Sequence, residues 1–150
     1  MAASWTKFRA ISGPERRTLL AAIAWLPIFW LGLRALGLRR VYDWSQRERP
    51  QIESNHSRDE IVRIATLVNI AALHGPFPAT CLTRSLLLGW MLRRRGVASR
   101  LRIGVRFTQG ILDAHAWVEC AGIPVNDRPD VGEQFAPFGE ALPPGAFQSP

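Results

Sequence analysis

Three residues suited to covalent acyl chemistry follow one another along the second half of the chain: Cys81, His115 and Asp127. An ionised thiol is a nucleophile, an imidazole can take up and return its proton, and a carboxylate can hold the imidazole in one orientation. Their order and types predict a cysteine acyl-transfer site, provided that the fold brings the three side chains together.

A helix start is the predicted position of Cys81. Pro76 and Pro78 push the residues before them away from helical angles, so the helix begins no earlier than Pro78. An apolar stripe then runs from Cys81 to three arginines, and Gly96 suits the end of the helix. Free amide groups at a helix start favour a negative thiolate. Taken alone, Cys81 fits a small buried apolar residue better than a nucleophile.

Two alternating segments predict the strands that carry His115. Residues 101–107 and 114–120 each alternate apolar and polar side chains, which is the period of a half-buried strand. On the second strand His115 and Trp117 share a face, and we expect Trp117 to pack on the helix of Cys81. Helices followed by antiparallel strands predict an α+β fold.

The hairpin after Cys120 decides whether Asp127 meets His115. A two-residue loop, Ala121-Gly122, places Asp127 opposite Ala116 on the wrong face, whereas a three-residue loop from Cys120 to Gly122 pairs it with His115. Directly paired side chains have Cβ atoms about 4.5–5.5 Å apart. We therefore predict the three-residue loop. Asp113 and Asp130 are the alternatives for the carboxylate.

Neither a metal nor a cofactor is expected. His115 and Cys120 face opposite ways on one strand and lie about 16 Å apart, so they do not share a zinc ion. The two cysteines lack Cys-x-x-Cys spacing, which argues against a zinc ribbon and a disulfide framework and makes a reducing cytoplasm the natural location.

The amino-terminal third is apolar. The uncharged run Thr18–Leu33 is shorter than the roughly 20 residues that span a membrane, and Pro27 interrupts it. We predict a buried or partner-facing helix pair. The alternatives are a membrane-surface helix, because Arg34, Arg39 and Arg40 suit anionic lipid, and a true membrane span. The polar segment Val41–Asn55 predicts a linker, which divides the chain into residues 1–50, apolar helix and linker, and residues 51–150, the catalytic domain.

The catalytic domain is predicted to open with a helix that has a capping box at Ser57 and Glu60 and that ends at Gly75. His74 suits a capping role at that helix end, and His56 is interpreted as a linker residue. From Asp130 onward the prolines and the lack of periodicity predict irregular structure.

The length of 150 residues fits one domain, and the net charge of +7 comes almost wholly from arginine. Such a charge suits an acidic partner, or serves only solubility. The basic residues between Arg93 and Arg106 lack interleaved aromatic residues, which disfavours a nucleic-acid binder.

Jointly, these motifs resemble a known family. Cys81-Leu82-Thr83-Arg84-Ser85-Leu86, the alternating strand after Arg100, Ala114-His115-Ala116-Trp117-Val118-Glu119 and Val125-Asn126-Asp127 are similar to the transglutaminase-like cysteine protease domain of lasso-peptide biosynthesis. The resemblance covers about residues 57–130. It implies a transglutaminase-like, papain-like core in which Cys81 is the nucleophile, His115 the general base and acid, and Asp127 the orienting carboxylate.

The resemblance also implies a function and partners. Such enzymes remove the leader from a ribosomally made precursor, so that an ATP-dependent cyclase can close the macrolactam. A winged-helix recognition domain is missing, which implies the split form that works with a separate small leader-recognition protein. We expect Leu19–Leu38 to contact that protein or the cyclase. The alternatives are an acyltransferase that uses the same triad, and a non-catalytic scaffold that binds peptide or nucleic acid.

Overall fold

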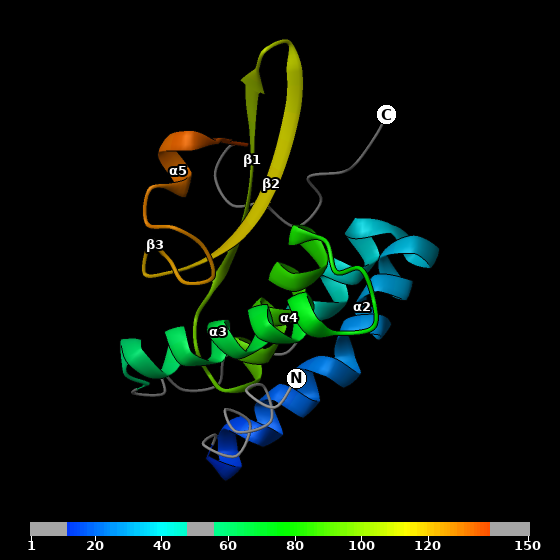
Figure 1. Cartoon of the computed structure of the whole chain (residues 1–150), viewed down its shortest axis with the longest axis vertical. Coiled ribbons are helices and arrows are strands. Elements are labelled where there is room, and N and C mark those ends of the chain that lie inside the picture. The colour runs from blue at the N-terminus through cyan, green and yellow to red at the C-terminus, as the bar shows by residue number, and fades with distance from the viewer. Residues whose placement is uncertain (1–11, 48–55, 139–150) are drawn as a thin grey trace, which may run out of the picture.

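The computed structural model describes residues 12–47 and 56–138, and its fold is α+β as predicted. The long helices gather at one end of the molecule, and a curled antiparallel sheet, with a short helix beside it, runs from them toward the other end (Figure 1). The elements in chain order are α2 (Gly13–Gln46), α3 (Arg58–His74), α4 (Cys81–Arg94), β1 (Arg100–Thr108), β2 (Ile111–Cys120), β3 (Ile123–Pro124), α5 (Val131–Gln134) and β4 (Ala136–Pro137).

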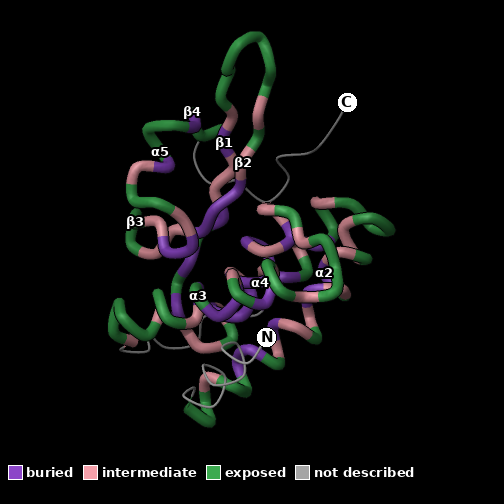
Figure 2. The backbone as a smooth tube through the Cα atoms, in the orientation of Figure 1, coloured by how far each residue is buried: buried purple, intermediate pink, exposed green. Residues whose placement is uncertain are grey.

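The sheet has the strand order β3-β2-β1-β4 and is built on the long hairpin of β1 and β2. Gln109 and Gly110 form its turn with φ values of 51° and 80°, the left-handed pair typical of a tight two-residue hairpin. The hairpin tip extends beyond the rest of the molecule and is exposed, whereas the opposite end of the sheet is buried against the helices (Figure 2).

Local capping explains where α3 begins. The Ser57 hydroxyl accepts a hydrogen bond from the Glu60 N–H at 3.3 Å, and the Glu60 carboxylate accepts one from the Ser57 N–H at 3.0 Å, as the sequence predicts. His56 is more than a linker residue. Its ring bonds the Glu60 carboxylate at 3.2 Å and the Arg95 carbonyl at 3.1 Å, so it joins the start of α3 to the end of α4.

The helix α2 is longer than expected and breaks at Gly37, where φ is 79° and ψ is 166°. The linker prediction is wrong for residues 41–46, which are helical, and residues 48–55 lie outside the described part of the chain. After the break Trp44 packs on Trp25 and Phe29, with ring centroids 6.4 and 5.7 Å apart. Aromatic packing therefore orders a segment that composition alone marks as polar.

The main core lies between the three long helices and one face of the sheet. Leu101, Ala116 and Val118 contribute that face, and they join buried residues of α2, α3 and α4 in one hydrophobic cluster. Because side chains alternate along a strand, Trp117 points the other way. The prediction that it packs on α4 is wrong.

A second, smaller cluster covers the other face of the sheet. It consists of Trp117, Val131 and Phe135, of which Trp117 is 1% exposed. The last two belong to α5 and the residue after it, so the prediction of irregular structure after Asp130 is wrong for residues 131–137. Residues 139–150 lie outside the described part of the chain.

Candidate active site

Cys81 is the first residue of α4, where the sequence places it. Thr80 caps the helix by accepting a hydrogen bond from the Thr83 N–H at 3.2 Å. The Cys81 thiol is free and half-buried. Its position therefore leaves the sulfur next to the unpaired amide groups of a helix start.

The neighbours of Cys81 one turn along α4 show which way its side of the helix points. Ser85 donates a hydrogen bond to the carbonyl of Ala116 on β2 at 2.9 Å, and Arg84 Nη2 lies 3.7 Å from Asp127 Oδ2. Residues three and four apart share a helix face. The face that carries Cys81 is therefore turned toward β2 and Asp127.

His115 and Asp127 are in direct contact. His115 Nε2 lies 2.7 Å from Asp127 Oδ2, and the two side chains are 22% and 18% exposed. A carboxylate on Nε2 holds the proton there, which leaves Nδ1 with the lone pair that a base requires. In the described part of the chain no hydrogen bond joins the Cys81 sulfur to His115, and such contacts often tighten only when substrate binds.

The predicted hairpin register is wrong, although the predicted contact forms. Cys120 pairs with Ile123 across the two-residue loop Ala121-Gly122, whose φ values are 50° and 78°. The prediction assumed that the ladder continues to Asp127. Instead β3 ends at Pro124, and the chain then leaves the regular ladder and reaches His115 by another path.

Asn126 fixes that path. Its side chain accepts a hydrogen bond from the Val118 N–H at 2.8 Å, where a ladder would supply a backbone carbonyl, and donates one to Ser85 Oγ at 3.0 Å. Its own carbonyl accepts one from Asn69 at 3.2 Å. Asn126 is 5% exposed, so the residue before Asp127 is bonded to β2, α3 and α4 in the interior.

Sequence reasoning gave no role to this network. Ser85 interrupts an otherwise apolar helix stripe, and Asn126 follows a buried valine. A buried polar residue needs a hydrogen-bond partner. The two polar residues Ser85 and Asn126, each next to buried apolar residues, are the sequence signal that indicates this network.

Two aromatic rings flank His115. The ring of Trp117 lies 6.3 Å from the imidazole and that of Phe135 lies 5.0 Å from it. Gly104, opposite His115 on β1, makes room for them, because a Cβ there would lie 2.9 Å from the Phe135 Cβ and 3.0 Å from the Trp117 ring. The imidazole is therefore held by packing as well as by Asp127.

The alternative carboxylates and the second thiol have other environments. Asp113 binds Arg106 Nη2 at 2.9 Å, and Asp130 accepts from Gln134 Nε2 at 2.7 Å. The Gln134 hydrogen bond is the main cause that lowers the pKa of Asp130. Burial raises the pKa of Cys120 to about 11, so this thiol is protonated at neutral pH.

Comparison with known families gives one result. A family model described as the transglutaminase-like superfamily matches residues 24–139. The match starts within α2 and includes Cys81, His115 and Asp127. Neither the curated proteins nor the solved structures give a match.

Proposed function

The chain belongs to the transglutaminase-like superfamily, and from that membership we propose that it is a cysteine peptidase with the triad Cys81, His115 and Asp127. The superfamily contains cysteine proteases and acyltransferases. The observation that carries the proposal is the 2.7 Å contact between His115 and Asp127 beside the face of α4 that starts with Cys81.

The reaction has two halves. In the first, His115 takes the proton of the Cys81 thiol, the thiolate attacks the carbonyl carbon of the scissile bond, and the backbone N–H of Cys81 donates to the developing oxyanion. His115 protonates the departing amine, the C–N bond breaks, and a thioester remains. In the second, His115 takes a proton from water as the water attacks the thioester, and the C–S bond breaks with return of the thiol.

The proposed substrate is the leader of a lasso-peptide precursor. The support is the resemblance of the motifs around the triad to leader peptidases of that biosynthesis, which belong to the family of transglutaminase-like proteins. Hydrolysis yields a free leader and a core peptide with a new amino terminus. A separate leader-recognition protein presents the precursor, and an ATP-dependent cyclase consumes the core peptide, in the cytoplasm.

The outer side of α2 is the proposed contact with the recognition protein. Leu20, Ile28 and Leu31 are 58%, 52% and 60% exposed, while Leu19, Leu26 and Phe29 of the same helix are buried in the core. By length and composition alone α2 is apolar enough to cross a membrane. One face of α2 packs on α3 and α4, and the other, exposed face is the one proposed to contact a partner.

The direct test is incubation of the chain with a lasso-peptide precursor and a leader-recognition protein, followed by mass spectrometry. Free leader and core peptide support a peptidase, and Cys81→Ala should stop their formation. A product in which an added amine replaces water at the new carboxyl terminus would instead assign the acyltransferase reaction. If Cys81→Ala leaves the yield of products unchanged, both the peptidase and the acyltransferase proposals are wrong.

A further inference from the structure

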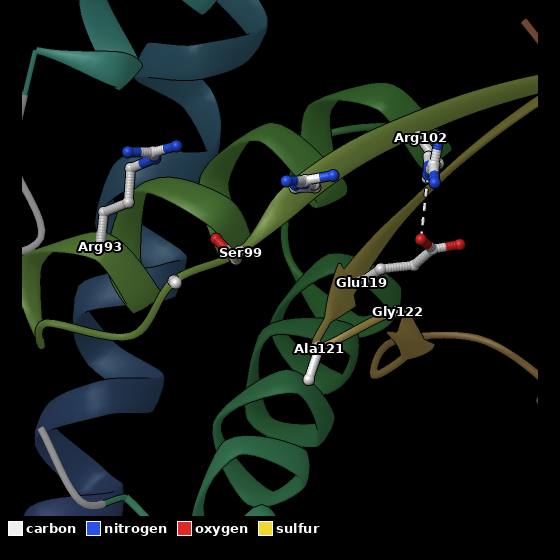
Figure 3. Close-up of a pocket in the computed structure, with 8 residues that line it drawn as sticks. Arg93, Ser99, Arg102, Glu119, Ala121 and Gly122 are labelled. Atoms are coloured by element: carbon white, nitrogen blue, oxygen red, sulfur yellow. Dashed lines mark hydrogen bonds and ion pairs between the residues drawn. The ribbon is translucent and has the colours of Figure 1, made fainter. Parts of the chain in front are cut away.

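A basic groove lies away from the candidate active site. It has a volume of about 480 Å³ and is formed by the end of α4, the start of β1 and the turn between β2 and β3. Figure 3 labels Ser99 between Arg93 and Arg102 in this view and marks the contact from Arg102 to Glu119 with a dashed line. The lining residues are Arg93, Ala98, Ser99, Arg100, Arg102 and Glu119, with Ala121 and Gly122 at the turn.

The single acidic residue among those that line the groove is already engaged. One Glu119 oxygen accepts from Arg102 Nε at 2.9 Å, and the other accepts from Trp117 Nε1 at 2.9 Å. Glu119 is therefore committed to neighbours on β1 and β2. Neither of these two hydrogen bonds goes to Arg93 or Arg100.

Arg93 and Arg100 make no hydrogen bond or ion pair within the described part of the chain, and Arg93 Nε is buried without a partner. The nearby Tyr42 carries no negative charge, because the ordinary pKa of a phenol already lies above neutral pH and burial raises the pKa of Tyr42 further. A buried N–H without an acceptor is costly, and guanidinium groups bind carboxylates in paired hydrogen bonds. The groove thus has two cationic side chains ready for an anion.

The groove lies at the far end of the helix that begins with Cys81. With a rise of 1.5 Å per residue, the α4 backbone carries Arg93 about 18 Å from Cys81. An extended peptide covers that distance in about five or six residues. A substrate held at Cys81 can therefore reach the groove with a segment close to its scissile bond.

We propose that this groove is an exosite that binds an acidic segment of the peptide substrate, with Arg93 and Arg100 on its carboxylates. The inference rests on the proposed peptidase function for the identity of the ligand. The carboxylates neutralise the positive charges of Arg93 and Arg100, which both line the groove. The site raises the affinity for substrate and takes no part in bond cleavage.

The test measures binding of a fluorescein-labelled hexaglutamate peptide to the full chain by fluorescence anisotropy at low salt. The test variant is Arg93→Gln/Arg100→Gln. The matched control is Arg17→Gln/Arg58→Gln, which removes two exposed arginines from α2 and α3 and the same charge. The groove pair should weaken binding by at least about 10-fold and the control pair by less than about 2-fold.

If the groove variant and the control variant lose the same affinity for the peptide, the exosite proposal is overturned, because the binding would then reflect only the net charge of the chain. Displacement of the probe by inorganic phosphate at equal charge concentration, or tighter groove-dependent binding of an oligothymidine, would overturn the assignment to an acidic peptide. Binding is measured without turnover. If the groove pair alone weakens peptide binding but the chain cleaves no precursor, the peptidase proposal fails and the exosite proposal stands. If the chain cleaves precursor but both variant pairs lose the same affinity, the exosite proposal fails and the peptidase proposal stands.

Discussion

The side chain of Asn126 should be required both for stability and for the position of Asp127. Asn126→Ala removes the acceptor of the buried Val118 N–H and the donor to Ser85 Oγ. An unsatisfied buried amide costs about 1–3 kcal/mol, and the volume lost with the amide adds to that cost. We expect a total near 3 kcal/mol, which lowers the Tm of a chain of this length by about 6–12 °C.

Activity should fall further than stability explains. Without the hydrogen bonds of Asn126, Asp127 is no longer held next to Nε2 of His115, and a misplacement of about 1 Å costs about 100-fold in rate. The assays are thermal denaturation followed by circular dichroism, and kcat for precursor cleavage at a temperature where the variant is fully folded.

Asn69→Ala is the matched control. It removes a hydrogen bond to the Asn126 carbonyl but leaves the Asn126 side chain in place, so it should cost about 1 kcal/mol and preserve kcat. The reasoning is refuted if Asn126→Ala is no less stable than Asn69→Ala, or if it keeps wild-type kcat.

Three further predictions follow from the same structure. Gly104→Ala should destabilise the fold by about 1–3 kcal/mol and lower kcat, because the added Cβ would meet Phe135 and Trp117 beside His115. The control Gly132→Ala, whose added Cβ has no atom within 4 Å, should change neither stability nor kcat. Equal melting temperatures for the two variants would contradict this prediction. Iodoacetamide at neutral pH should label Cys81 of the native protein and spare Cys120, whose pKa burial raises to about 11, and peptide mapping that finds Cys120 labelled first would be the opposite result. Hydrogen bonds from Arg63 and Ser12 lower the pKa of Glu15 to about 2 from 4.5, so its stabilisation is present above pH 4.5 and is lost as the pH falls through 2. The Tm difference between wild type and Glu15→Gln should therefore close at low pH, and a difference that grows on acidification would show the sign to be wrong.

Local signals in the sequence predict the parts of the fold that depend on neighbouring residues. The capping box at Ser57 determines where α3 begins, and the prolines before Cys81 determine where α4 begins. Each signal lies within a few residues of the helix start, and both helices begin where the sequence predicts. The α+β class and the superfamily follow from motifs of the same short range.

The remaining errors concern one tight turn and the contacts between segments that are distant in the sequence. Ala121 in a left-handed conformation leaves no strong sequence signal, so the register of β2 and β3 was predicted one residue out. The sequence predicts that Trp117 packs on the helix of Cys81, because no local pattern indicates that Phe135, the residue after α5, covers it. Asn126 depends on partners in three other elements, so its role emerges only from the assembled structure.

The central claim is that Cys81 carries the acyl group during cleavage. Acid quenching of the chain during turnover of precursor, followed by mass spectrometry of its peptides, tests this directly. The account predicts an adduct on the Cys81 peptide equal to the mass of the leader less one water, and no adduct after Cys81→Ala or His115→Ala. Cleavage that proceeds without this adduct and survives Cys81→Ala would contradict it.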